Sequence, residues 1–149
     1  MPEPVLALAK SGEVHMHNPI VAILVAGIAA WIFGAVWYGA LGKPWQRAQG
    51  LDPEACKDKK MPLNLLVVSF LTALVMSATI YYLLANMGVI GVGPSALVGL
   101  TIGVGLIWVA ILVNNLFQQR HFTLTVIDGA HWALALTIEA VVVSLLAWH

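Results

Sequence analysis

Long apolar stretches alternate with short polar segments along the chain. No charged residue occurs from Pro19 to Gly42 or from Met61 to Gln119. Because a helix needs roughly 20 apolar residues to cross about 30 Å of hydrocarbon, the first stretch predicts one membrane span and the second predicts two. The glycines and the proline of Gly88–Ser95 mark the turn between those two spans. The whole pattern predicts four spans, at about 19–42, 62–87, 95–117 and 129–148.

Residues at the ends of these stretches predict where the helices begin and stop. Asn18 can cap the first helix, with Pro19 at its first position, and Gly42 followed by Pro44 predicts its end. Asp128 stands where a cap of the last helix would lie. The preceding "RHFTLTVI" is expected to form an interfacial segment or an extra helical turn.

Backbone polar groups in a bilayer must be satisfied within each segment, so we expect an all-α, four-helix membrane bundle. Residues 1–18 are expected to be an external tail and 19–149 a single membrane domain. Within the loop 43–60, "LDPEACKDKK" predicts a short surface helix capped by Asp52. Six of the seven Lys and Arg residues lie in 43–60 or 118–128. The positive-inside rule therefore places both loops in the cytoplasm and both termini outside.

Composition supports a bilayer as the main solvent of this chain. Its residues are 60% hydrophobic and 9% charged, whereas a soluble domain has about 25% charged residues. The net charge of zero argues against nucleic acid as a partner. The single Cys56 excludes an intrachain disulfide and a site with several cysteine ligands.

Three ionisable residues share one stripe of the last span. At about 100° per residue, Asp128, His131 and Glu139 fall on the same side of a helix. Asp128 is at the cytoplasmic boundary, where it can be a helix cap, and His131 can bond a neighbouring carbonyl or belong to a site. Glu139 is near the middle of the membrane, where it must be neutral, paired or facing a polar cavity. Two roles are open for Glu139. It can make one interhelical hydrogen bond, or its carboxyl can carry a proton or bind a cation.

Amides near the end of the third span extend this polar region. Asn114 and Asn115 lie about one turn from its cytoplasmic end, and a buried amide needs several hydrogen-bond partners. In an antiparallel pair of spans, Asn115 is expected at the depth of His131. We therefore expect these amides to form a cytoplasm-facing pocket with Asp128 and His131. The alternative is interhelical bonding, which contributes about 1 kcal/mol per bond in membranes.

Small and aromatic residues indicate packing faces and interfaces. Glycines in the first span, and Gly99 with Gly103 in the third, allow close helix approach within a subunit or between subunits. We expect a homo-oligomer formed through such faces. Trp37, Tyr38 and Trp45 are expected first as an interfacial belt and second as a ligand box.

Metal and cofactor signals are weak. The tail contains His15, Met16 and His17, side chains that suit copper. Haem held by two histidines would require a dimer, because His131 is the histidine within a predicted span. The chain has no HExxH, GxSxG or Walker-type motif. No cofactor is predicted, and a non-enzymatic role is favoured.

Two segments resemble one known family. "FGAVWYGALGKPWQRAQGL" is similar to its tryptophan–tyrosine and Gly-Lys-x-Trp signature, and "NNLFQQRHFTLTVIDGAHW" is similar to its second signature. The family is a small bacterial four-span family, catalogued as domain of unknown function 1761. The resemblance covers about residues 19–148 and implies a bacterial inner membrane. It marks as family-like Trp37, Tyr38, Lys43, Trp45, Asn114, Asn115 and His131.

This chain departs from the family pattern at two residues. Asp128 stands where the pattern has an asparagine, and Glu139 has no counterpart. The family has no assigned activity, so the resemblance implies an architecture without a mechanism. The leading hypothesis is a membrane protein that binds or conducts a small solute or proton through a polar pocket on spans three and four. The alternatives are an accessory or assembly subunit of a larger membrane complex, and a metal- or haem-binding membrane protein.

Overall fold

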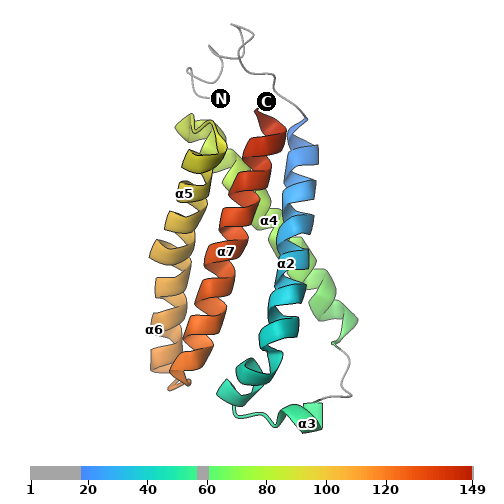
Figure 1. Ribbon diagram of the computed structural model, residues 1–149, viewed down its shortest axis with the longest axis vertical. Helices are drawn as coiled ribbons and strands as arrows, with labels where there is room; N and C mark the ends of the chain where they lie inside the picture. Colours follow the sequence, from blue (N-terminus) through green and yellow to red (C-terminus); the bar gives the residue numbers. More distant parts are fainter. Residues whose placement is uncertain (1–17, 57–60, 149) are drawn as a thin grey trace, which may run out of the picture.

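The protein is a bundle of long helices, as a computed structural model describes it for residues 18–56 and 61–148. In this part of the chain no strand occurs, and the predicted all-α bundle is confirmed. Four helices are long and apolar enough to cross a membrane. In order, the elements are α2 (Pro19–Ala48), the short α3 (Pro53–Cys56), α4 (Leu63–Met87), α5 (Val92–Ile102) continued by the π-helical η1 (Gly103–Trp108) and α6 (Val109–Phe117), and α7 (Phe122–Ala147) (Figure 1).

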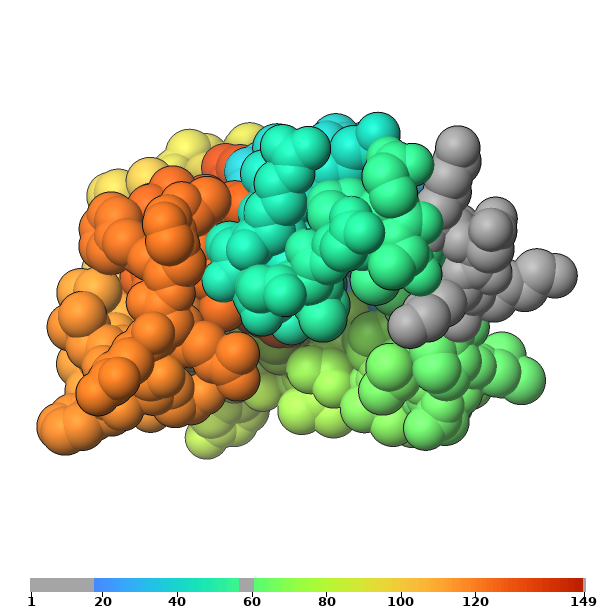
Figure 2. Space-filling view, turned by 90° about the horizontal axis from the view of Figure 1, so that it is seen from below, coloured from blue at the N-terminus to red at the C-terminus, as the bar shows by residue number. Residues whose placement is uncertain are grey.

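Helix α7 is the centre of the bundle. It packs against α2 on one side and against α5, η1 and α6 on the other, and α4 crosses these helices obliquely (Figure 1). From the end that carries α3, the end of α2 (teal) lies between the α6–α7 turn (orange) and the start of α4 (green), as Figure 2 shows. Helix α7 is therefore enclosed from several directions; of its ionisable side chains, His131 and Glu139 are buried and Asp128 is half-buried.

The first helix begins as predicted but ends later. The Asn18 side chain accepts a hydrogen bond from the Ile20 backbone N–H at 2.9 Å, which confirms its capping role. The prediction that Gly42 and Pro44 end the helix is wrong, because α2 continues to Ala48. Pro44 removes one backbone donor near the helix end, and the side chain of Trp45 bonds to α7 in that last turn.

The last helix starts two turns earlier than predicted. His121 is its N-cap and accepts a hydrogen bond from the Thr123 N–H at 3.2 Å. The segment before Asp128 is therefore helical, and the interpretation of Asp128 as a helix cap is wrong. Because the link between α6 and α7 is short, α7 turns back along α6 almost at once.

The turn between the second and third predicted spans is also shorter than expected. Helix α4 ends at Met87, and Gly88 follows it with a φ of 65°, a left-handed conformation that glycine adopts without strain. Gly91 has a φ of 100°, and α5 begins at Val92, one turn before the predicted start at Ser95. The turn therefore consists of 88–91, and Pro94 falls in the first turn of α5, where a missing N–H is tolerated.

Glycines on the predicted packing faces are used within the chain. A Cβ atom at Gly99 would lie 2.5 Å from the backbone oxygen of Leu136, and one at Gly103 would lie 2.5 Å from the Cα atom of Ala133. A Cβ atom at Gly27 would similarly meet Leu74 of α4, at 2.7 Å. At Gly27, Gly99 and Gly103 these faces are occupied by neighbouring helices of the same chain, whereas a Cβ atom at Gly39 of α2 would meet nothing within 4 Å. A homo-oligomer stays a prediction.

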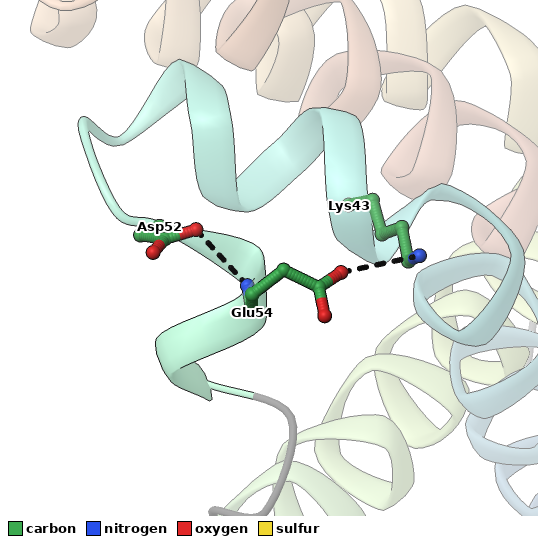
Figure 3. Close-up of polar contacts among 3 residues, drawn as sticks. All are labelled: Lys43, Asp52 and Glu54. Atoms are coloured by element: carbon green, nitrogen blue, oxygen red, sulfur yellow. Dashed lines mark hydrogen bonds and ion pairs between the residues drawn. The ribbon is translucent and has the colours of Figure 1, made fainter.

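A short helix follows α2 near the end of the bundle, as predicted. The Asp52 carboxylate accepts a hydrogen bond from the Glu54 N–H at 3.0 Å and caps α3 (Figure 3). Glu54 also pairs with Lys43 at 3.7 Å, with both side chains about 70% exposed (72% and 69%). The lysines predicted for the second half of this surface helix lie outside the described residues.

Candidate functional site

Asp128 is the point where α2 and α7 are joined by side-chain hydrogen bonds. Its Oδ1 atom accepts one bond from the Tyr38 hydroxyl at 2.8 Å and another from the Trp45 Nε1–H at 2.9 Å. Tyr38 and Trp45 are seven residues apart, so two helical turns bring them to one face of α2. Trp37 donates to the backbone oxygen of Ile127 at 3.2 Å. The polar atoms of these three aromatic residues therefore point to α7. An interfacial belt does not require such hydrogen bonds to another helix.

His131 lies one turn further along α7, inside a group of aromatic rings. It is 7% exposed, its ring stacks on Phe33 with centroids 5.8 Å apart, and the Tyr38 ring is 4.9 Å away. Gly34 allows this position, because a Cβ atom there would lie 3.0 Å from the His131 Nε2 atom. The Nδ1 atom is buried without a hydrogen-bond partner in the described structure. The expected bond from His131 to a carbonyl is therefore not made at this nitrogen.

Glu139 lies deeper on the same stripe of α7. It is 2% exposed, and its Oε2 atom is buried with no partner among the described residues. The contacts of Asp128 with Tyr38 and of His131 with Gly34 set an antiparallel register between α7 and α2. That register places Glu139 level with Ala26, which is fully buried. The interhelical hydrogen bond considered for Glu139 is not made by Oε2.

The carboxyl groups of α7 have no basic partner in the described ranges. The ion pair found there joins Lys43 to Glu54 on the surface. Arg47, in the last turn of α2, is exposed and makes no ion pair with Asp128. Within the described ranges, Asp128 therefore has two neutral hydrogen-bond donors and no basic partner.

The asparagines predicted for this site lie elsewhere. Asn115 donates a hydrogen bond to the Thr125 hydroxyl at 3.0 Å, and Asn114 is exposed. The expected cluster of both amides with Asp128 and His131 is therefore wrong. The reason is the early start of α7, which places Thr125 rather than His131 beside Asn115. The Asn115–Thr125 bond matches the alternative interpretation of interhelical bonding.

The described residues contain no group of three or more His, Cys, Asp or Glu side chains that could hold a metal ion. His15, Met16 and His17 lie outside these residues. Two apolar hollows occur on the surface, one lined by Val113, Leu116 and Phe117, and the other by Asn18, Val21, Leu145 and Leu146. Neither hollow is lined by the polar residues of α7.

Sequence reasoning missed some residues that shape this region. Phe33 and Gly34 position the His131 ring, and Thr125 receives the bond from Asn115. Phe33 and Tyr38 both contact the His131 imidazole. Nothing in the sequence spacing identifies Phe33 as a residue of this site. Gly34 carried a signal, because it continues the small-residue spacing of Gly27 in the same span.

The fold and these contacts define a multi-pass membrane protein whose first and last long helices meet through polar and aromatic side chains. The chain belongs to the family described as "Protein of unknown function (DUF1761)", whose family model matches residues 21–144. The resemblance seen in the sequence is thereby confirmed. No curated protein and no solved structure matches the chain.

Proposed function

We propose that this protein binds a small cationic solute or a proton at a polar site between α2 and α7, without enzymatic activity. The site consists of Asp128, Tyr38, Trp45 and His131, with Glu139 as a deeper group of the same stripe. It therefore uses the first and fourth spans rather than the third and fourth. The proposed setting is a bacterial inner membrane, with both termini outside and this end of the bundle facing the cytoplasm.

The observation that carries the proposal is that the Asp128 carboxyl accepts hydrogen bonds from two neutral donors and forms no ion pair with any described residue. Two hydrogen bonds from neutral donors, at 2.8 and 2.9 Å, hold Oδ1 of Asp128 against α2. A partly buried carboxylate without a counter-ion is unfavourable by several kcal/mol. Binding of a cation or of a proton removes that penalty, so the site favours such a ligand over an anion or a neutral solute.

Glu139 extends the proposal toward the middle of the membrane. A carboxyl group that is 2% exposed and lacks a basic partner in the described structure is stable there as the neutral acid. A neutral carboxyl holds a proton that it can release when a path opens. His131 lies between Asp128 and Glu139 on the same face of α7, and its buried Nδ1 atom can accept or donate a proton.

Proton flux into reconstituted vesicles tests this function. Vesicles containing a pH-sensitive dye receive a potassium gradient and valinomycin, and dye fluorescence reports proton entry. We expect flux with the wild-type protein and its loss in Glu139→Gln and His131→Ala. Glu54→Gln is the matched control, because it removes one carboxylate from the exposed α3 and leaves flux unchanged. Equal flux in wild-type and variant vesicles would remove Glu139 and His131 from the mechanism.

The second candidate is an accessory subunit of a larger membrane complex. Helix α4 supports it, because its first half carries exposed apolar side chains and lies apart from α6 and α7 (Figure 1); these include Leu63, Leu65, Val67, Val68 and Leu71. Purification from native membranes in mild detergent separates the two candidates. A stable complex with other polypeptides supports the subunit, and the chain alone supports the solute-binding protein.

A further inference from the structure

We infer that Trp108, held by the π-helical turn η1, is a positioning residue that keeps Asp128 of α7 in register with α2. Its contact with α7 follows from the structure alone, whereas its importance for binding a solute or a proton rests on the proposed function. The inference gives the third span a role in the site, although the hydrogen bonds to Asp128 come from α2.

The Trp108 side chain lies directly against α7 at Gly129. A Cβ atom at Gly129 would overlap the Cγ, Cδ1 and Nε1 atoms of Trp108, so only glycine leaves room for this ring. Gly129 follows Asp128 in the chain, and at about 100° per residue the two residues lie on different sides of α7. Helix α7 is therefore held by the Trp108 indole on one side and by the hydrogen bonds of Tyr38 and Trp45 on another.

A second contact of the third span supports α7 on the other side of Asp128 along the chain. Asn115 is seven residues after Trp108, so two turns bring both side chains to one face of this span. Asn115 donates its hydrogen bond to Thr125, which precedes Asp128 by three residues. The two contacts of the third span therefore flank the residue that binds to α2.

The π-helical turn decides which residue of the third span reaches Gly129. Gly103 of η1 meets Ala133 and Trp108 meets Gly129, so five steps along η1 (103 to 108) match four steps along α7 (133 to 129). A π-helical turn closes with i→i+5 bonds and takes one residue more than an α-helical turn, and such turns are frequent at functional sites. Without the extra residue, Trp108 and α6 would be rotated by about 100° relative to α5 and would turn away from α7.

A displacement of α7 at Gly129 moves the acceptor atoms of three hydrogen bonds from α2. The bond from the Trp37 indole to the Ile127 backbone oxygen is 3.2 Å long, and those to Asp128 are 2.8 and 2.9 Å. Because hydrogen bonds tolerate a narrow range of distance and angle, a lateral shift of α7 by about 1 Å alters all three. Packing at Gly129 is therefore coupled to the geometry of the site.

Indole N–H signals in NMR spectra of the protein in lipid nanodiscs, with isotope-labelled tryptophan, test the inference. Trp37 and Trp45 are the reporters, because their N–H groups donate to α7. Trp31 is the internal control, because its Nε1–H donates to Ser69 of α4 at 3.0 Å. We expect Gly129→Ala to shift both reporter signals and to leave the Trp31 signal in place.

Three comparisons show whether the shift comes from Trp108. Trp108→Ala alone should also shift the reporter signals, because α7 loses the ring against which it packs. Adding Gly129→Ala to Trp108→Ala should cause no further shift, because the overlapping ring atoms are gone. Gly105→Ala is the matched control in η1 and should change nothing, because a Cβ atom there meets nothing within 4 Å.

Unchanged reporter signals in Gly129→Ala and in Trp108→Ala would overturn the inference. A shift of the Trp31 signal as large as that of the reporters would overturn it too, because it would show a general disturbance of the bundle. If Gly129→Ala fails to fold, the comparison of Trp108→Ala with Gly105→Ala decides the question.

Proton flux in the vesicle assay separates the inference from the proposed function. Wild-type flux that is lost in Gly129→Ala and Trp108→Ala, and kept in Gly105→Ala, supports both. Shifted reporter signals without flux in any protein, wild type included, would overturn the proton function and leave the positioning role of Trp108 in place. Wild-type flux with unchanged reporter signals in both variants would overturn the positioning role and leave the proposed function in place.

Discussion

Replacing Gly99 by alanine tests the close approach of α5 to α7. The new Cβ atom would lie 2.5 Å from the Leu136 backbone oxygen and 2.9 Å from the Thr137 Cα atom. Neither atom belongs to a flexible side chain, so the two helices must move apart along their contact. Overpacking of this kind destabilises a protein by about 1–3 kcal/mol.

Gly105 provides the matched control in the same continuous helix. A Cβ atom there meets nothing within 4 Å. Alanine is favoured over glycine inside a helix by about 1 kcal/mol, and this gain applies to both substitutions. The difference between Gly99→Ala and Gly105→Ala therefore isolates the packing cost, about 1–3 kcal/mol in the free energy of unfolding.

Unfolding by sodium dodecyl sulfate in mixed micelles, followed by circular dichroism, measures this difference. We expect Gly99→Ala to unfold at a lower detergent fraction than wild type and Gly105→Ala at the same or a higher one. Equal unfolding curves for the two variants would refute the close packing of α5 on α7. A lower stability of Gly105→Ala than of Gly99→Ala would refute the assignment of their environments.

Three further predictions concern the polar contacts of α7. Asn115→Ala should destabilise the bundle by about 1 kcal/mol, and a double-mutant cycle with Thr125→Val should give a coupling energy of about 0.6 kcal/mol or more. Additive effects of the two substitutions in the same unfolding assay would contradict the hydrogen bond between Asn115 and Thr125 at 3.0 Å. Glu139 should react with dicyclohexylcarbodiimide in membranes, because this apolar reagent modifies neutral buried carboxyl groups; peptide mass spectrometry should find the adduct at Glu139 and none at the exposed Glu54. Gly34→Ala should displace the His131 ring, whose Nε2 atom would lie 3.0 Å from the new Cβ atom, and so shift its imidazole NMR signals; Gly39→Ala, in open space on the same helix, should leave them unchanged.

Local signals in the sequence determine much of this architecture. Apolar stretches of more than about 20 residues can satisfy their backbone in a bilayer only as helices, so the four long helices follow from the hydrophobic pattern. Asn18 and Asp52 cap helices through side chains two residues from their partners. Such contacts depend on neighbouring residues, so they can be predicted without the tertiary fold.

The composition of the candidate site depended on the register between helices. The local sequence allows Asp128 to be a helix cap. Because α7 starts at Phe122, Asp128 lies inside the helix and accepts hydrogen bonds from Tyr38 and Trp45 instead. The same early start pairs Asn115 with Thr125 and separates it from His131. A few residues at a short link shift every later contact, and no local pattern encodes that shift.

The sequence by itself determined the class of protein, the number of long helices and the stripe of ionisable residues on the last one. Only the tertiary structure decided which helix faces that stripe. In a soluble bundle an apolar face identifies the interior, but lipid tails are as apolar as the helix core, so hydropathy does not distinguish the two sides. The contacts of α2 with Asp128 and His131 depend instead on close packing at Gly34 and on directed hydrogen bonds from Tyr38 and Trp45.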